Sequence, residues 1–206
     1  MIRLIHDNGK NSPEEYDRIF KLREKKGPDW SDIRRWEWLV YKFMGGRILD
    51  IGCLDSGVGQ IAYEWNDTAE VWGIDLSTEA IQTMQKRYPD FHYEVRDAYD
   101  TKFPDEMFDY IVIGEVLEHS EDPHKIIKEA MRILAPGGVL ALSVPKDEYL
   151  EPGAVDGDRH IWSFSVDNVK SLLKPYGTVK IKVLRSRWFP KYRYCWPQIL
   201  AFCTKQ

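Results

Sequence analysis

From residue 47 onward, the chain alternates short apolar segments with segments whose apolar residues recur at helical spacing. Short apolar runs bounded by turn residues are typical of buried strands, and apolar residues that recur at helical spacing are typical of amphipathic helices. Strands joined by helices imply βαβ units. We therefore expect an α/β, doubly wound, Rossmann-like sheet of seven strands, mostly parallel, with helices on both faces and an antiparallel last strand. The expected strands are 47–51, 70–74, 91–95, 108–113, 137–144, 178–184 and one near 198–204, and the expected helices are 58–66, 77–88, 124–134 and 165–173.

Before residue 47 the pattern is helical only. Two helices are expected, at 14–25 and 31–44, with Pro28 as a breaker between them and Ser31 as the N-cap of the second. The pair Gly45-Gly46 should end the second helix. We divide the single domain expected for residues 1–206 into an N-terminal helical lid (1–45), a cofactor-binding core (46–145), and a substrate loop with C-terminal strands (146–206).

Length and composition support one globular domain. The chain has 206 residues, of which 43% are hydrophobic and 30% charged. No apolar run approaches the roughly 20 residues that span a bilayer, and the N-terminus lacks the apolar stretch of a signal peptide, so we expect a cytoplasmic protein. Cys53, Cys195 and Cys203 form no CxxC pair, which argues against a disulfide scaffold or a structural zinc site.

Charge is unevenly distributed along the chain. After Asp167 there are nine Lys and Arg residues and no Asp or Glu. One interpretation is an exposed sheet edge with outward lysines, and the other is a surface for an anionic substrate or nucleic acid. The aromatic and basic segment 188–196, WFPKYRYCW, could stack on nucleic acid or form an irregular connection at the sheet edge. We favour a small-molecule acceptor, because one short basic segment is a weak signal for nucleic acid.

The segment that follows the first strand of the sheet, DIGCLDSGVG at 50–59, reads as a glycine-rich βα turn. Gly52, Gly57 and Gly59 would let the backbone turn sharply and approach a ligand. Alone, such a turn indicates only a nucleotide-type site. Asp75 ends the next strand, where a carboxylate can accept hydrogen bonds from ribose hydroxyls. The alternative role for Asp75 is a favourable charge at a helix N-terminus.

Three further motifs follow in chain order. After the third strand, Asp97 could accept from an adenine amino group and the Ala98 amide could donate to the ring, or Asp97 could instead cap a turn. The segment IGEVLEH follows the fourth strand. The last motif is a helix end, a Pro-Gly-Gly turn and a strand in RILAPGGVLALSVP.

Taken in order, LDIGC, GID, RDA, FDYIVIGEVLEHSEDP and RILAPGGVLALSVP resemble the class I S-adenosylmethionine-dependent methyltransferases, especially the small-molecule enzymes related to ubiquinone-biosynthesis O-methyltransferases. The resemblance is close over 47–145. One departure is Leu54, which replaces a glycine of the usual loop and is followed by one extra residue. The resemblance implies S-adenosyl-L-methionine as cofactor, with Asp50, Gly52 and Cys53 at its methionine part, Asp75 at the ribose, and Leu76, Asp97 and Ala98 at the adenine. Gly57 would be a further cofactor-binding residue, and Glu115 would lie at the floor of the reaction cleft.

The reaction this implies is methyl transfer to an oxygen or nitrogen atom of a small acceptor. An anionic acceptor would suit the basic C-terminal part of the chain. His119 is the leading general base, with Glu115 and His160 as further catalytic candidates. Glu115, Glu118 and His119 form ExxEH, a cluster that some relatives use for a divalent metal, although we expect none here. The alternatives are a nicotinamide-dependent oxidoreductase and a methyltransferase-like binding protein without turnover. Nothing in the sequence indicates an oligomeric state.

Overall fold

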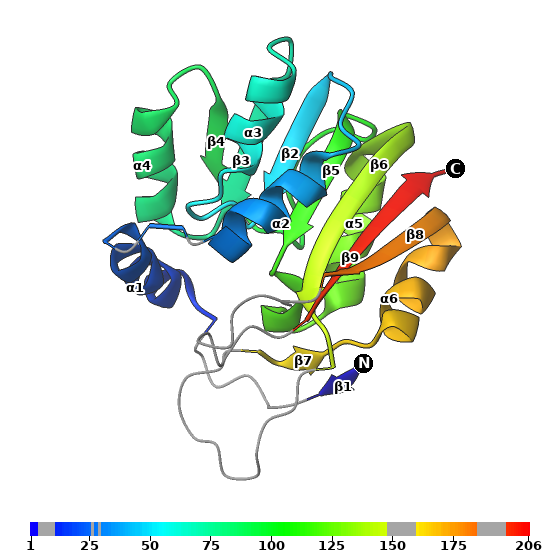
Figure 1. The fold of residues 1–206 in the computed structure, drawn as a ribbon. Helices are drawn as coiled ribbons and strands as arrows, with labels where there is room; N and C mark the ends of the chain where they lie inside the picture. Colours follow the sequence, from blue (N-terminus) through cyan, green and yellow to red (C-terminus); the bar gives the residue numbers. More distant parts are fainter. Residues whose placement is uncertain (4–10, 26, 29, 148–159, 185–196) are drawn as a thin grey trace, which may run out of the picture.

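A computed structural model describes residues 1–3, 11–25, 27–28, 30–147, 160–184 and 197–206. Its centre is a seven-stranded sheet of order β4-β3-β2-β5-β6-β9-β8 (Figure 1). The first five strands in that order are parallel, and β9 is antiparallel to both of its neighbours. The expected mostly parallel sheet with an antiparallel last strand is thus confirmed. Its strands are β2 (Arg47–Ile51), β3 (Glu70–Asp75), β4 (His92–Val95), β5 (Phe108–Gly114), β6 (Leu134–Pro145), β8 (Gly177–Leu184) and β9 (Gln198–Lys205).

Helices cover both faces of the sheet, as expected. Apolar residues of β2 and β5 alternate between the faces, with Ile48 and Tyr110 on one side and Leu49 and Ile111 on the other. One face packs against α2 (Trp30–Val40), α3 (Val58–Trp65) and α4 (Thr78–Arg87). The opposite face packs against α5 (Pro123–Ile133) and α6 (Val166–Leu173) (Figure 1). Because the central strands are buried on both faces, their sequences are almost continuously apolar.

Capping residues explain where several helices begin. The side chains of Ser77 and Ser165 accept from backbone amides of α4 and α6, and Asp122 caps α5 with Pro123 at its first position. The prediction for Ser31 was wrong, because α2 already begins at Trp30. The same helix ends at Val40, four residues before the predicted end.

Strand β6 is longer than predicted. It begins at Leu134 and therefore includes the Pro-Gly-Gly segment that the sequence suggested as a turn. Its pairing with β5 shifts register between Phe108 and Tyr110. Leu134 pairs with Phe108 and Val139 with Tyr110, so the Pro-Gly-Gly residues lie within this irregularity.

In the described part of the chain, the N-terminal segment contacts α4 and β7 (Trp162–Ser163) as well as the loop after β2. Helix α1 (Pro13–Glu24) lies beside α4, where Asp17 accepts hydrogen bonds from the Ser77 hydroxyl (2.6 Å) and the Glu79 amide (3.1 Å). Lys21 pairs with Glu79 at 2.6 Å. Strand β1 (Ile2–Arg3) pairs with β7 below the main sheet (Figure 1). The described residues also include two short 3-10 helices, η1 (Leu117–His119) and η2 (Lys174–Tyr176).

The basic C-terminal part forms the edge of the sheet where the structure describes it. Lys180 and Lys182 lie on the edge strand β8, and the Lys182 ammonium lies 3.1 Å from the centroid of the Trp38 ring. The aromatic segment 188–196, Cys195 and most of the predicted substrate loop lie outside the described residues. Among the described helices, none has both the length and the apolar character to cross a membrane.

Candidate active site

A cavity of about 490 Å³ opens at the carboxyl ends of the parallel strands. Its walls come from the segments that follow β2, β3, β4 and β5, together with α1 and α2. In a doubly wound sheet this is the expected position of a ligand site. Among the predicted site residues, those lining the cavity are Gly52, Cys53, Asp75, Leu76, Asp97, Ala98, Glu115, Glu118, His119 and His160. Asp50 and Gly57 are not among the lining residues.

The loop after β2 is shaped by close packing. Gly52 has φ +75°, and a Cβ there would lie 2.3 Å from a methyl group of Val116. A Cβ on Gly57 would lie 2.9 Å from the Trp36 ring. Leu54, the residue that departs from the usual glycine, has φ +35° and so retains a left-handed backbone. Gly57 therefore makes room for a tryptophan, a role that differs from the predicted contact with a ligand.

The carboxylate of Asp75 ties two segments of the site together. It accepts from the Leu54 amide at 2.9 Å through one oxygen and from the Ser77 amide at 2.8 Å through the other. Burial raises the pKa of Asp75, and these amide bonds partly oppose the rise. Each carboxylate oxygen has a second lone pair for a ligand. A pair of vicinal hydroxyls on a bound ribose would fit this acceptor set.

Asp50 lies beneath the loop at the end of β2 and is only 5% exposed. Burial raises its pKa to about 7; a hydrogen bond with the Ser56 side chain opposes the rise, and the nearby Asp75 charge adds to it. Ser56 in turn accepts from the Val58 amide at 3.0 Å, at the start of α3. Asp50 thus supports the loop from below.

The segment after β4 forms another wall. Asp97 accepts from the Tyr99 amide at 2.8 Å, which is the turn contact considered as its alternative role. Asp97 also lines the cavity, together with Ala98 and Leu76, and its carboxylate has further lone pairs beyond this turn contact. Apolar surface for a flat ring comes from Ile51, Ile74 and Ile126.

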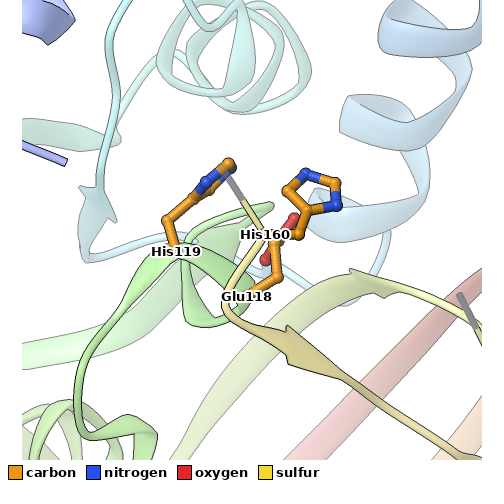
Figure 2. A group of neighbouring side chains, drawn as sticks. All are labelled: Glu118, His119 and His160. Carbon is orange, nitrogen blue, oxygen red and sulfur yellow. The ribbon is translucent and has the colours of Figure 1, made fainter. Parts of the chain in front are cut away.

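The segment after β5 brings the candidate catalytic residues together. Glu115 has φ +57°, and its carboxylate accepts from the Ser143 hydroxyl at 2.8 Å, which anchors it to β6. Glu118, His119 and His160 lie together, with one ligand atom from each within 4.8 Å of the others (Figure 2). The two imidazole centroids are 4.7 Å apart. Glu115 is not part of this group, so the three residues that meet differ from the predicted set by the exchange of Glu115 for His160.

Backbone pairing explains how His160 reaches the cluster from 41 positions along the chain. The Ile161 amide donates to the Glu118 carbonyl at 2.5 Å, and the Trp162 indole donates to the Ser120 carbonyl at 2.8 Å. These bonds fix the segment beside η1. One carboxylate and two imidazoles can serve as a proton acceptor or as the donor set of a divalent transition metal.

Sequence reasoning missed the polar residues that α1 and α2 contribute. Arg23 of α1 binds Asp55 with distances of 3.0 and 3.2 Å, which links that helix to the loop after β2. Arg35 of α2 also lines the cavity and donates to Asp32 at 2.8 Å. A charged residue in a helix pattern does not indicate whether its side chain faces solvent or a cavity, so the sequence did not single out Arg23 or Arg35.

Comparison with known proteins agrees with this geometry. Residues 49–142 match the family model described as a methyltransferase domain. An uncharacterized protein of Methanocaldococcus jannaschii is 35% identical over 138 residues, covering 66% of this chain and 61% of that relative. A demethylmenaquinone methyltransferase of Staphylococcus saprophyticus is 28% identical over 151 residues, covering 66% and 60%. The chain therefore spans less than two thirds of the length of these relatives.

The fold has matches among solved structures. A SAM-dependent methyltransferase of Methanosarcina mazei superposes with a TM-score of 0.62 at 22% identity, covering 80% of this chain and 94% of that one. The family match and the superposition both indicate similarity to methyltransferases. The sheet order and the position of the cavity agree with that similarity. Residues 49–142 thus resemble a methyltransferase domain, and the fold is one that S-adenosylmethionine-dependent methyltransferases share.

Proposed function

We propose that the chain transfers the methyl group of S-adenosylmethionine to an oxygen or nitrogen atom of a small acceptor. The observation that carries this proposal is the single cavity wall that joins the loop after β2, the Asp75 carboxylate and the Glu118–His119–His160 cluster. A cofactor held by the first two would lie beside the third. The cavity volume is in the range of small-molecule sites.

The cofactor contacts follow from the residues that line the cavity. Asp75 would accept from the ribose hydroxyls with its free lone pairs, and Leu76, Asp97 and Ala98 would surround the adenine. The loop Gly52–Ser56 would lie against the methionine part, with Asp50 beneath it. A positively charged sulfonium or ammonium group suits this wall, because carboxylates outnumber guanidinium groups on it.

The chemical step needs little from the protein beyond alignment and proton removal. The bond between the sulfonium sulfur and the methyl carbon breaks as the acceptor lone pair bonds to that carbon, and S-adenosylhomocysteine departs as a neutral thioether. The acceptor proton passes to an imidazole, for which His119 is the first candidate and His160 the second. Glu118 would hold the imidazoles in orientation.

Binding and turnover tests separate this proposal from its alternatives. Calorimetry should show S-adenosylhomocysteine binding and no comparable NADH binding, and NADH binding alone would favour an oxidoreductase. Tritiated S-adenosylmethionine with a panel of phenols, amines and carboxylic acids then identifies an acceptor. His119→Ala should abolish transfer and retain S-adenosylhomocysteine affinity. The matched control is His124→Ala, at an exposed position at the start of α5, which should alter neither.

A divalent metal is a second candidate for activating the acceptor, and the cluster geometry favours testing it. The donor set of Glu118, His119 and His160 fits manganese or zinc. Such a metal, when bound, polarises a ligand oxygen and favours loss of its proton. Calorimetry with MnCl₂ on EDTA-treated protein should show binding that His119→Ala removes. Unchanged transfer after EDTA treatment, together with no MnCl₂ binding, would exclude the metal and support an imidazole as the proton acceptor.

A further inference from the structure

The sheet face that packs against α2 carries lysines at its outer end. Lys180 pairs in register with Phe202, and Lys182 pairs with Leu200. Phe202 and Leu200 belong to the apolar cluster beneath α2, so both lysines project from that same face of β8. In Figure 1, α2 lies in front of the central strands, whereas β9 and β8 are in full view at the end of the sheet.

Aromatic rings lie among these lysines. The Lys182 ammonium lies 3.1 Å from the centroid of the Trp38 ring, and the Lys42 ammonium lies 5.2 Å from the centroid of the Phe202 ring. Tyr41 packs edge to face between the two rings, 5.2 Å from Trp38 and 4.9 Å from Phe202 between centroids. Tyr41 is also 43% exposed. We call the following residues the lysine face: Trp38, Tyr41, Lys42, Lys180 and Lys182.

No ion pair among the described residues neutralises the lysine face. The strands β6, β8 and β9 contain no Asp or Glu, and Glu37 of α2 pairs with Arg34 at 3.9 Å. The described lysines that form ion pairs are others: Lys21, Lys102 and Lys146. Burial lowers the pKa of Lys42, and the positive charge of Lys180 lowers it further. A chain with a net charge of −4 thus gathers three positive charges that repel one another.

We propose that the lysine face binds a single-stranded nucleic acid. Residues two apart on one face of a strand lie about 6.6 Å from each other, which is close to the spacing of successive phosphates in an extended single strand. Lys180 and Lys182 therefore each pair with a phosphate, and Lys42 pairs with a third. The exposed ring of Tyr41 gives a base a surface for stacking. This inference goes beyond the proposed methyl transfer and does not depend on it.

Two alternatives have different consequences. If the lysine stems only cover the apolar sheet face, the lysine face binds no anion. An acidic protein segment would pair with the same lysines, but its carboxylates would gain nothing from the exposed ring of Tyr41. Face-to-face docking of a second copy is opposed by repulsion between the lysines of the two copies.

Fluorescence anisotropy with a labelled oligothymidylate of about 12 nucleotides tests the proposal. Three contacts between lysine and phosphate predict that raising NaCl from about 50 to about 200 mM weakens binding about 20-fold. Lys180→Gln combined with Lys182→Gln removes two charges and keeps polar side chains. At the lower salt concentration this double variant should bind at least tenfold more weakly than the wild type. The slope of its logarithmic salt dependence should fall to about a third.

Tyr41→Ala separates stacking from charge. It should weaken binding at least about fivefold and leave the salt dependence unchanged, because it removes a ring and no charge. The matched control is Lys125→Gln combined with Lys128→Gln, which removes two exposed lysines of α5 on the opposite face of the sheet. This control should change neither the affinity nor the salt dependence. Urea unfolding checks that each variant is folded.

The proposal is overturned if the wild type does not bind the oligonucleotide, or if the α5 control loses as much affinity as the double variant of β8. It is also overturned if oligoglutamate of equal charge displaces the oligonucleotide at equal concentration and Tyr41→Ala has no effect, because that result indicates an acidic protein partner. Calorimetry with S-adenosylhomocysteine remains the separate test of methyl transfer, so the failure of either proposal leaves the other standing.

Discussion

Asp50→Asn tests how strongly the fold at the end of β2 resists a buried charge. Asparagine has nearly the shape of aspartate and can still accept a hydrogen bond from Ser56, but it never ionises. The wild-type carboxyl is 5% exposed, and burial raises its pKa to about 7 from an ordinary value of 3.8. The two proteins therefore differ mainly in the cost of ionising position 50.

The size of the stability difference follows from the difference between the pKa values of Asp50 in the folded and unfolded chains. Below pH 3.8 both states of the wild type keep the proton, and Asp50 costs nothing. Between pH 3.8 and about 7 the unfolded chain ionises while the folded one stays protonated, so wild-type stability falls by about 1.4 kcal/mol per pH unit relative to the variant. Above pH 7 the difference levels at about 4 kcal/mol, which is an upper limit because relaxation reduces it.

Urea unfolding at pH 5, 6, 7 and 8 measures this difference. The stability of Asp50→Asn minus that of the wild type should rise with pH up to 7 and then level off. The control Asp90→Asn removes an exposed carboxylate after α4, and its difference from the wild type should stay flat. A flat difference for Asp50→Asn as well, or one that falls with rising pH, would refute the reasoning from burial.

Three other changes test separate parts of the structure. Asp75→Ala should weaken S-adenosylhomocysteine binding by about 1–3 kcal/mol in calorimetry, and an unchanged dissociation constant would count against the ribose role. Gly52→Ala should lower the free energy of unfolding by about 1–3 kcal/mol in urea, because its Cβ meets Val116 at 2.3 Å and φ is +75°. Glu129→Gln should cost at most about 3 kcal/mol above pH 4.5, since hydrogen bonding to Arg132 lowers the pKa of this 10% exposed carboxyl to about 2. That cost should disappear as the pH falls from 4.5 towards 2 in urea unfolding, and a cost that persists in acid would contradict it.

The sheet was predictable because its strands are buried on both faces and carry unbroken apolar runs. The segments FDYIVI and GGVLALSV carry only Asp109 and Ser143 as polar side chains, too few for the solvent face of a helix, and both are strands in the structure. The start of α5 was predictable for a local reason: Asp122 and Pro123 satisfy the first helical positions by themselves. In such cases the deciding interactions lie within a few residues along the chain.

The start of α2 and the composition of the catalytic cluster were not predictable in this way. Ser31 could cap a helix, but α2 begins one residue before it. His160 joins His119 only because residue 161 pairs with the backbone of Glu118, a contact between distant segments. Arg35 was missed for a related reason, since its position beside Glu115 and Glu118 depends on contacts between segments that are distant in the chain. Tertiary contacts decide these features, and periodicity does not report them.

The position of β9 has a consequence for how the molecule reaches its folded state. Strand β8 precedes β9 in the chain, yet its partner in the sheet is β9, which lies between β8 and β6. Parallel strands β2 to β6 can assemble as the chain grows, but β8 can join the sheet only through β9, either after β9 has inserted beside β6 or as a β8–β9 pair that docks as a unit. This end of the sheet therefore cannot form until β9 has been synthesised. Contacts between β6 and β9 join residues more than fifty positions apart, so their formation should be among the slow events of folding.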